Sequence, residues 1–272
     1  MNRILAAVFA AVLAPLGAVG PWLALGVLSL VTAVVMLLVF RLVSNQAGIR
    51  RAKARVVGQL LAIRLFKDDP WMTVRGLGGA LRENLGYLRH ALFPLLVMMV
   101  PVGLILVHLD PWFARTPLQP GAVTRVAVVV APGADRSLPA VELHPSDTGA
   151  YRVETPPLRI PSLGEIDWRV RVEGAGSSEL RFSVDGKTFA KELVAGTGMP
   201  RVNAVRSRGL LGALLYPGEP TLEGAPAIRE VVVDYPAREF TVLGLSMPWW
   251  LAFFLLTLVL AFLLKKPLRV EA

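Results

Sequence analysis

Residues 37–55 read LLVFRLVSNQAGIRRAKAR, and residues 89–109 read RHALFPLLVMMVPVGLILVHL. The first run passes from an apolar stretch into a basic one, and the second passes from a basic stretch into another apolar one. Between residues 44 and 90 there are nine Lys or Arg side chains against three Asp or Glu side chains. Short loops rich in Lys and Arg stay on the cytoplasmic side of a membrane. The pattern therefore predicts an integral membrane protein whose segment 44–90 is cytoplasmic.

The composition of the whole chain agrees with this prediction. The 272 residues are 54% hydrophobic and have a mean hydropathy of +0.55, so the chain is too apolar for an ordinary soluble domain. Its formal net charge is +9. Much of the positive excess lies beside the predicted spans, where anionic lipid and membrane orientation explain it, so DNA is not an expected partner. There is no cysteine, which excludes disulfides and thiolate metal sites.

Three stretches hold enough apolar residues, about 20, to cross a hydrocarbon core about 30 Å thick. The expected transmembrane helices are residues 21–43, 91–109 and 246–265, and a cytoplasmic tail, residues 266–272, follows the last one. Trp22, Trp112 and Trp249 lie near their ends, where the lipid headgroups favour Trp. The apolar interiors contain no charged residue, which argues against an ion-coupled transporter because ion pathways usually need such groups at depth.

The N-terminal segment, residues 1–20, has three interpretations. Ile4–Val19 is apolar, follows Arg3 and is interrupted by Pro15. It forms a fourth span, an interfacial helix or a cleaved signal peptide, and cleavage fits least because no small-x-small site precedes a polar sequence. The positive-inside rule tolerates three or four spans. We expect this segment to associate with the membrane without a full crossing.

The cytoplasmic segment, residues 44–90, has the periodicity of two amphipathic helices. Apolar side chains recur at spacings of three and four residues on both sides of Asp69-Pro70, which is a typical helix start. We expect an antiparallel helical hairpin whose apolar faces either bury each other or rest on the bilayer. Alternatively, the hairpin guards a cytoplasmic opening or contacts a ribosome or a client. The candidate contacts with lipid or a ribosome are Arg50, Arg51, Arg55 and Arg64.

Residues 116–241 differ in character, because Pro and Gly separate short alternating segments. Residues 168–172 and 180–184 alternate apolar and polar side chains, and Asp185-Gly186 suits a two-residue hairpin turn. Short strands at this spacing predict an extracytoplasmic all-β domain of the sandwich type, inserted before the last span. Within it, Gly209–Tyr216 is rich in leucine. We expect a short helix that covers the sheet; the alternative is an exposed apolar loop that touches the membrane or a partner.

The chemistry of catalysis and metal binding is not evident in the sequence. His90, His108 and His144 fall on three levels of the predicted topology, so a three-ligand metal site is not expected. His144, Ser146 and Asp147 are close in sequence, but such a run is typical of a turn rather than of a catalytic triad. We therefore expect neither an enzyme nor a bound cofactor.

Two short motifs and the order of the elements carry a family resemblance. The motifs are Ser44-Asn45-Gln46, directly after the first span, and Phe93-Pro94-Leu95-Leu96 through Val100-Pro101 in the second. With a basic hairpin between these spans and a third span before a basic tail, the chain resembles the Oxa/YidC-type insertase superfamily. The similarity is greatest to the branch that contains the third subunit of the ER membrane protein complex and its short archaeal relatives. The resemblance covers roughly residues 21–110 and the last span, and the β-domain lies outside it.

The resemblance implies a helical bundle with a groove open to the cytoplasm and the lipid, and a hairpin at its mouth. A polar groove lowers the cost of moving a client's hydrophilic flank across the membrane. In this chain the groove would be lined by Ser29, Thr32, Met36, Met98, Met99 and Thr257. The alternative is that each hydroxyl bonds its own helix backbone and each Met fills a packing gap. Insertases of the YidC type often carry an Arg in the groove, whereas the apolar interior of each predicted span lacks one.

The expected fold is a membrane α-helical bundle of three or four spans, with a cytoplasmic helical hairpin and an inserted extracytoplasmic β-domain. The expected location is a bacterial-type inner (plasma) membrane, with a periplasmic domain. The expected function is to assist membrane-protein insertion or assembly, with the lipid bilayer, nascent membrane proteins or the ribosome, and an extracytoplasmic protein as partners. The rival hypothesis is a non-catalytic envelope scaffold whose spans anchor a partner-binding β-domain. A membrane subunit of a transport complex is a third hypothesis.

Overall fold

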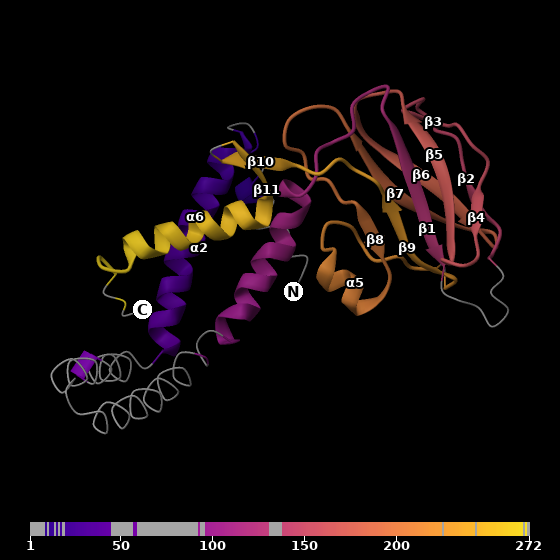
Figure 1. Cartoon of the computed structure of the whole chain (residues 1–272). Coiled ribbons are helices and arrows are strands. Elements are labelled where there is room, and N and C mark those ends of the chain that lie inside the picture. The colour runs from indigo at the N-terminus through magenta and orange to yellow at the C-terminus, as the bar shows by residue number, and fades with distance from the viewer. Residues whose placement is uncertain are drawn as a thin grey trace, which may run out of the picture. The chain divides into compact units, whose positions relative to one another are not determined.

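The chain divides into two compact units, residues 1–25 with 105–252 and residues 26–104 with 253–272 (Figure 1). The computed structural model describes residues 9, 11–13, 15, 17, 20–44, 57–58, 92, 96–130, 138–224, 226–242, 244–268 and 270. The hairpin predicted for residues 44–90 therefore lies outside the described residues, apart from Ser44 and the helical residues 57 and 58. The candidate lipid or ribosome contacts also lie outside them, namely Arg50, Arg51, Arg55 and Arg64.

In the described part of the chain, two helices are long and apolar enough to cross a membrane. They are α2, Pro21–Val43, with 23 residues, and the helix Leu96–Phe113, with 18 residues. A third apolar helix, α6, Trp249–Leu264, is shorter, with 16 residues. Helix α2 begins after Gly20, whose φ of 100° suits glycine, and Pro21 occupies the first helical position, where its missing N–H is not needed.

The helices turn large apolar side chains outward. On α2 the exposed ones are Trp22, Leu23, Val27, Leu30, Val31, Val35, Leu38 and Leu42. On α6 they are Trp250, Phe254, Leu255, Leu258, Val259, Phe262 and Leu263. The helices of soluble proteins place polar side chains on their exposed faces, whereas a helix that is apolar all round belongs in a protein core or a membrane. Because these apolar faces are exposed, they favour a membrane environment.

The helix boundaries differ from the predicted spans at the ends next to the β-domain. The sequence predicts that the second span ends at Leu109, but the helix continues to Phe113. The third span is predicted from residue 246. Its first three residues instead belong to strand β11, Leu245–Pro248, which pairs with β10, Glu239–Val242. Helix α6 begins only at Trp249. A short β-hairpin therefore leads into the last apolar helix.

The β-domain consists of two antiparallel sheets packed face to face (Figure 1). Its strands are β1 (Val123–Val130), β2 (Val141–Leu143), β3 (Tyr151–Val153), β4 (Leu158–Ile160), β5 (Glu165–Val172), β6 (Gly176–Val184), β7 (Lys187–Ala195), β8 (Val205–Ser207) and β9 (Ile228–Val233). The six-stranded sheet has the order β3-β5-β1-β9-β8, with β4 also paired to β5. The three-stranded sheet has the order β2-β6-β7. The prediction of a β-sheet domain in this region is confirmed, and the domain also contains a short helix, α5, Gly209–Leu215.

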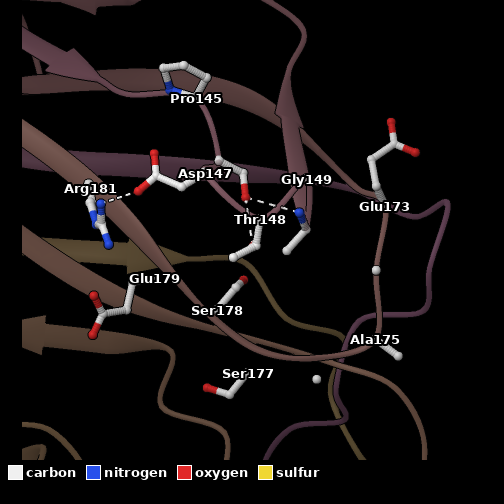
Figure 2. A pocket seen from close by; sticks show the side chains of 14 residues that line it. Pro145, Asp147, Thr148, Gly149, Glu173, Ala175, Ser177, Ser178, Glu179 and Arg181 are labelled. Atoms are coloured by element: carbon white, nitrogen blue, oxygen red, sulfur yellow. Dashed lines mark hydrogen bonds and ion pairs between the residues drawn. The ribbon is translucent and has the colours of Figure 1, made fainter.

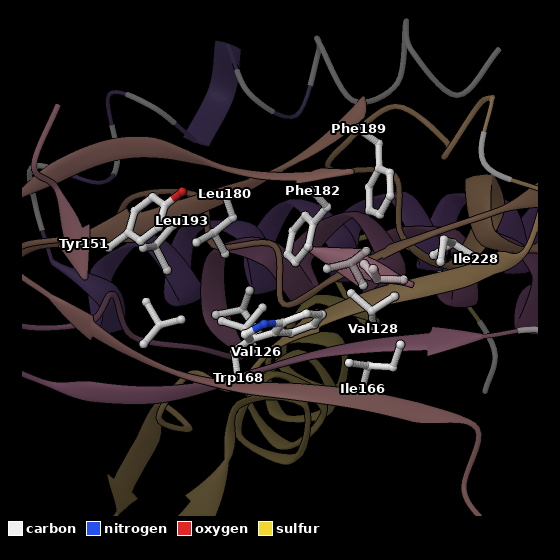
Figure 3. Packing of buried hydrophobic residues seen from close by; sticks show 14 of the residues in the cluster. Val126, Val128, Tyr151, Ile166, Trp168, Leu180, Phe182, Phe189, Leu193 and Ile228 are labelled. Carbon is white, nitrogen blue, oxygen red and sulfur yellow. The ribbon is translucent and has the colours of Figure 1, made fainter. Parts of the chain in front are cut away.

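The core of the β-domain lies between the two sheets, as Figure 3 shows. Trp168 of β5 meets Phe182 of β6 edge-on, with ring centroids 5.8 Å apart, and Phe182 stacks on Phe189 of β7 at 5.2 Å. The turn that joins β6 to β7 has φ values of 49° at Asp185 and 72° at Gly186. Positive φ at both central residues is the hairpin geometry that matches strand twist. The alternation and the turn predicted from the sequence are both present.

The leucine-rich segment differs from expectation. It forms a short helix, α5, Gly209–Leu215, but its leucines do not cover the sheet. Leu210 is 93% exposed and Leu211 is 69% exposed. Gly212 is the buried residue of α5, and a Cβ at this position would lie 1.9 Å from Ser207 Oγ. The helix therefore packs through its glycine, and the surrounding leucines project outward, so the expectation of a buried helix is wrong.

Candidate functional site

The sequence-predicted groove residues of α2 lie on one helical face. Ser29, Thr32 and Met36 follow each other at spacings of three and four residues, and all three are buried. The opposite face carries the exposed aliphatic side chains described above. Ser29 and Thr32 thus lie inward among buried apolar side chains of α2, while the outward positions are apolar as well, unlike those of a soluble surface helix.

In the described part of the chain, two hydroxyl groups on the apolar helices are buried without a hydrogen bond. Among the described residues, Ser29 Oγ on α2 and Thr257 Oγ1 on α6 are buried and have no hydrogen-bond partner. Ser29 is 0% exposed, and Thr257 is partly buried. Leaving a buried hydroxyl unpaired costs about 1–3 kcal/mol. The alternative that each hydroxyl bonds its own helix backbone therefore does not describe Ser29 or Thr257.

The methionines of the predicted groove have different exposures. Met36 is buried on α2, Met98 is partly buried, and Met99 is 62% exposed. All six predicted groove residues belong to the unit that contains residues 26–104 and 253–272. Within this unit, Arg41 Nη1 donates to Leu268 O at 3.4 Å, so the basic end of α2 lies beside the segment that follows α6.

An aromatic cluster joins the other unit's helix ends to the β-domain. Phe240 of β10 meets Trp22 edge-on, with ring centroids 5.0 Å apart, and lies 6.4 Å from Phe113. Phe113 in turn stacks on Trp249 at 6.1 Å. We call these four residues the aromatic junction. Sequence reasoning placed Trp at the ends of the spans but did not find Phe240, which contacts Trp22 and Phe113.

Backbone hydrogen bonds tie the two chain segments that enter and leave the β-domain. Thr116 N donates to Pro236 O and Arg238 N donates to Ala114 O, both at 2.9 Å. The Arg115 guanidinium also donates to Tyr235 O at 3.2 Å. The β-domain is therefore connected to the helix Leu96–Phe113 through paired backbone rather than through a loose linker.

A polar cleft of about 540 Å³ opens on the β-domain between the loop after β2 and the start of β6 (Figure 2). Ser146 Oγ accepts from Ala150 N at 3.0 Å, and Asp147 forms an ion pair with Arg181. Figure 2 shows Ser178 and Glu179 on the side of the cleft opposite Thr148. Ser146 and Asp147 thus belong to a turn, as predicted, and Asp147 also binds the neighbouring strand β6 through Arg181. The hydroxyl and carboxylate lining suits a small polar molecule or a polar peptide edge.

A buried ion pair lies on the inward face of β7 and was missed by sequence reasoning. Lys191 is 0% exposed and is bonded to Glu219 and, at 2.5 Å, to Asn203 O. Burial lowers the pKa of the Lys191 ammonium and raises the pKa of the Glu219 carboxyl. The pair fixes the segment after α5 to β7. The alternation of the sequence does indicate that Lys191 is buried, because Lys191 occupies an inward position of β7 between Phe189 and Leu193.

A metal centre is not apparent in the part of the chain that the structure describes, where no three His, Asp or Glu side chains lie close enough to hold an ion. No family model, no curated protein and no solved structure matches this chain. Its function is therefore inferred from the geometry of its own residues.

Proposed function

We propose that this chain is a multi-pass protein of a bacterial-type plasma membrane that assists the insertion or assembly of other membrane proteins. The proposal rests chiefly on one observation: among the described residues, the hydroxyls of Ser29 and Thr257 are buried without a hydrogen-bond partner, on helices with apolar outer faces. A polar flank of a client, or water that accompanies it, would satisfy these hydroxyls. Such a pairing would lower the cost of holding a hydrophilic segment within the hydrocarbon region.

The ends of the helices support an orientation for this proposal. Trp22, Phe113 and Trp249 share the aromatic junction beside the β-domain, as expected at a membrane interface. Arg41 and Lys265 lie at the opposite ends of α2 and α6. The β-domain is then extracytoplasmic and the basic ends are cytoplasmic. Helix α6 spans about 24 Å at 1.5 Å per residue, so its crossing relies on Lys265 and Lys266 reaching the headgroups.

Photo-crosslinking from within native membranes tests the proposed activity. A crosslinking amino acid at Thr257 or at Met98 should capture newly synthesised membrane proteins. Val259 is the matched control, because it lies on the same helix but is exposed on the apolar face. A crosslinker there should capture mainly lipid. If positions 257 and 98 capture only lipid, or the same stable protein in every sample, the proposal is wrong.

The rival candidate is an envelope scaffold, and the polar cleft of the β-domain favours it. In that case the cleft binds an extracytoplasmic partner and the helices serve only as anchors. A crosslinker at Ser178 should then capture one stable partner, while positions 257 and 98 capture no newly made proteins. Capture of newly made proteins at Thr257 without any product at Ser178 would exclude the scaffold.

A further inference from the structure

The exposed apolar face of α5 belongs to a helix that the β-domain holds in place on both sides. Leu210, Leu211, Leu214, Leu215 and Tyr216 are all exposed, although the helix itself is fixed at both ends. Before it, Arg208 N donates to Arg229 O at 3.0 Å, and after it Leu222 N donates to Ser207 O at 3.1 Å. Large apolar side chains that are held in water carry a cost that a matching apolar surface would remove.

The segment that follows α5 is held firmly as well. Glu219 is bonded to the buried Lys191, and Arg206 donates to Pro220 O at 2.8 Å and to Ala190 O. With Gly212 packed against Ser207 on the inner side, rotation of α5 to bury its leucines would require breaking these contacts. The outward direction of the leucines is therefore a stable property of the fold.

We infer that α5 inserts its leucines into the outer leaflet of the bilayer in which the chain is embedded. Charge supports lipid as the occupant. Arg208 and Arg229 are exposed at the start of the helix and adjoin each other through their backbones. An apolar helix face bordered by Arg is the pattern by which proteins bind the headgroup region of anionic bilayers.

The reach of the chain also supports lipid. Val202 N donates to Pro111 O at 2.7 Å, so the loop after β7 touches the end of the helix Leu96–Phe113. Helix α5 begins at Gly209, seven residues farther along the chain. Seven residues extend at most about 25 Å, so α5 starts within that distance of the membrane-crossing helix. The inference does not require insertase activity.

Depth-dependent fluorescence quenching tests the inference on the full chain. The chain has no cysteine, so Leu210→Cys gives a single labelling site for an environment-sensitive fluorophore. In vesicles of phosphatidylethanolamine and phosphatidylglycerol, brominated acyl chains should quench position 210, with a blue shift of its emission. Val259→Cys on α6 is the membrane-embedded reference. Leu163→Cys is the matched control, because Leu163 is an exposed leucine on a turn of the same domain.

Three results would overturn parts or all of the inference. Equal and weak quenching at positions 210 and 163 would show that α5 stays in water. If the fluorophore at position 210 is shielded from water in native membranes but not in pure-lipid vesicles, the surface belongs to a protein partner. Quenching at position 210 that is unchanged when phosphatidylcholine replaces the anionic lipid would remove the role given to Arg208 and Arg229.

Discussion

At the scale of single residues, Lys191 places an ammonium group in the interior of the β-domain, where its side chain is fully buried. A charged group in a protein interior must be paired, and Lys191 achieves this with Glu219 and the carbonyl oxygen of Asn203. The pair adds little net stability relative to apolar side chains, but it determines where the segment after α5 can lie. Its position on an inward register of β7 is visible in the sequence, whereas its partner, 28 residues later, is not.

Replacing one partner of this pair should destabilise the fold strongly. Lys191→Met leaves the Glu219 carboxylate buried without its cation, and we expect a loss of about 3–5 kcal/mol in the free energy of unfolding. Combining Lys191→Met with Glu219→Gln should recover most of the loss. Lys187→Met, at an exposed position of the same strand, is the control and should stay within about 0.5 kcal/mol. Denaturant titrations measure all four proteins, and a silent Lys191→Met would contradict the buried pair.

The pH dependence of the Lys191→Met protein should be opposite to ordinary acid denaturation. Burial raises the pKa of the Glu219 carboxyl in the folded state above its usual 4.5. At a pH between 4.5 and that raised pKa, the folded state therefore binds more protons than the unfolded state. The stability of this variant should therefore rise as the pH falls from neutral toward 4.5. Melting temperatures over that range provide the measurement, and Glu219→Gln in the same background should abolish the effect. A continuous fall in stability on acidification would contradict the raised pKa.

At the scale of elements, helical and strand periodicity explain what the sequence predicts well. A period of 3.6 places Ser29, Thr32 and Met36 on one face of α2, and a period of two places Trp168 and Val170 in the core. Periodicity failed for α5, because the leucines of a short helix indicate an apolar face without saying what meets it. It also failed at the β10–β11 hairpin, where residues 246–248, included in the predicted third span, pair as a strand before the helix begins at Trp249.

The buried hydroxyls of α2 and α6 give opposite expectations for stability and for activity. Ser29→Ala and Thr257→Val each remove a hydroxyl that is buried without a partner among the described residues. We expect each change to leave stability equal or to raise it by about 1–3 kcal/mol. If these hydroxyls serve clients, the same variants should lower the abundance of other membrane proteins. Melting in detergent and quantitative membrane proteomics measure the two effects.

A matched control separates a lost hydroxyl from a general change in the helix. Val259→Ala shortens an exposed side chain two positions from Thr257 and should alter neither stability nor the proteome. A loss of stability in Ser29→Ala would mean that its hydroxyl is paired. Stabilised variants with a normal membrane proteome would favour the scaffold over the insertase.

At the scale of the whole molecule, orientation is the property with the widest consequences. We expect Lys187→Cys, on the β-domain, to react with a membrane-impermeant thiol reagent in intact spheroplasts. Lys266→Cys, after α6, should react only after the membrane is permeabilised, because the positive-inside rule places the basic tail in the cytoplasm. Both side chains are exposed, and the natural chain contributes no cysteine background. Labelling of Lys266→Cys from outside would reverse the proposed topology.

The paired segments at the base of the β-domain also have an evolutionary consequence. Because Ala114–Thr116 and Pro236–Arg238 are hydrogen-bonded to each other, the chain enters and leaves the domain at adjacent points. A domain whose ends adjoin can be gained or lost within a loop without moving the elements on either side. Residues 117–235 therefore have the connectivity of a removable cassette. A lineage could acquire or discard it in a single genetic event while its membrane helices kept their order and direction.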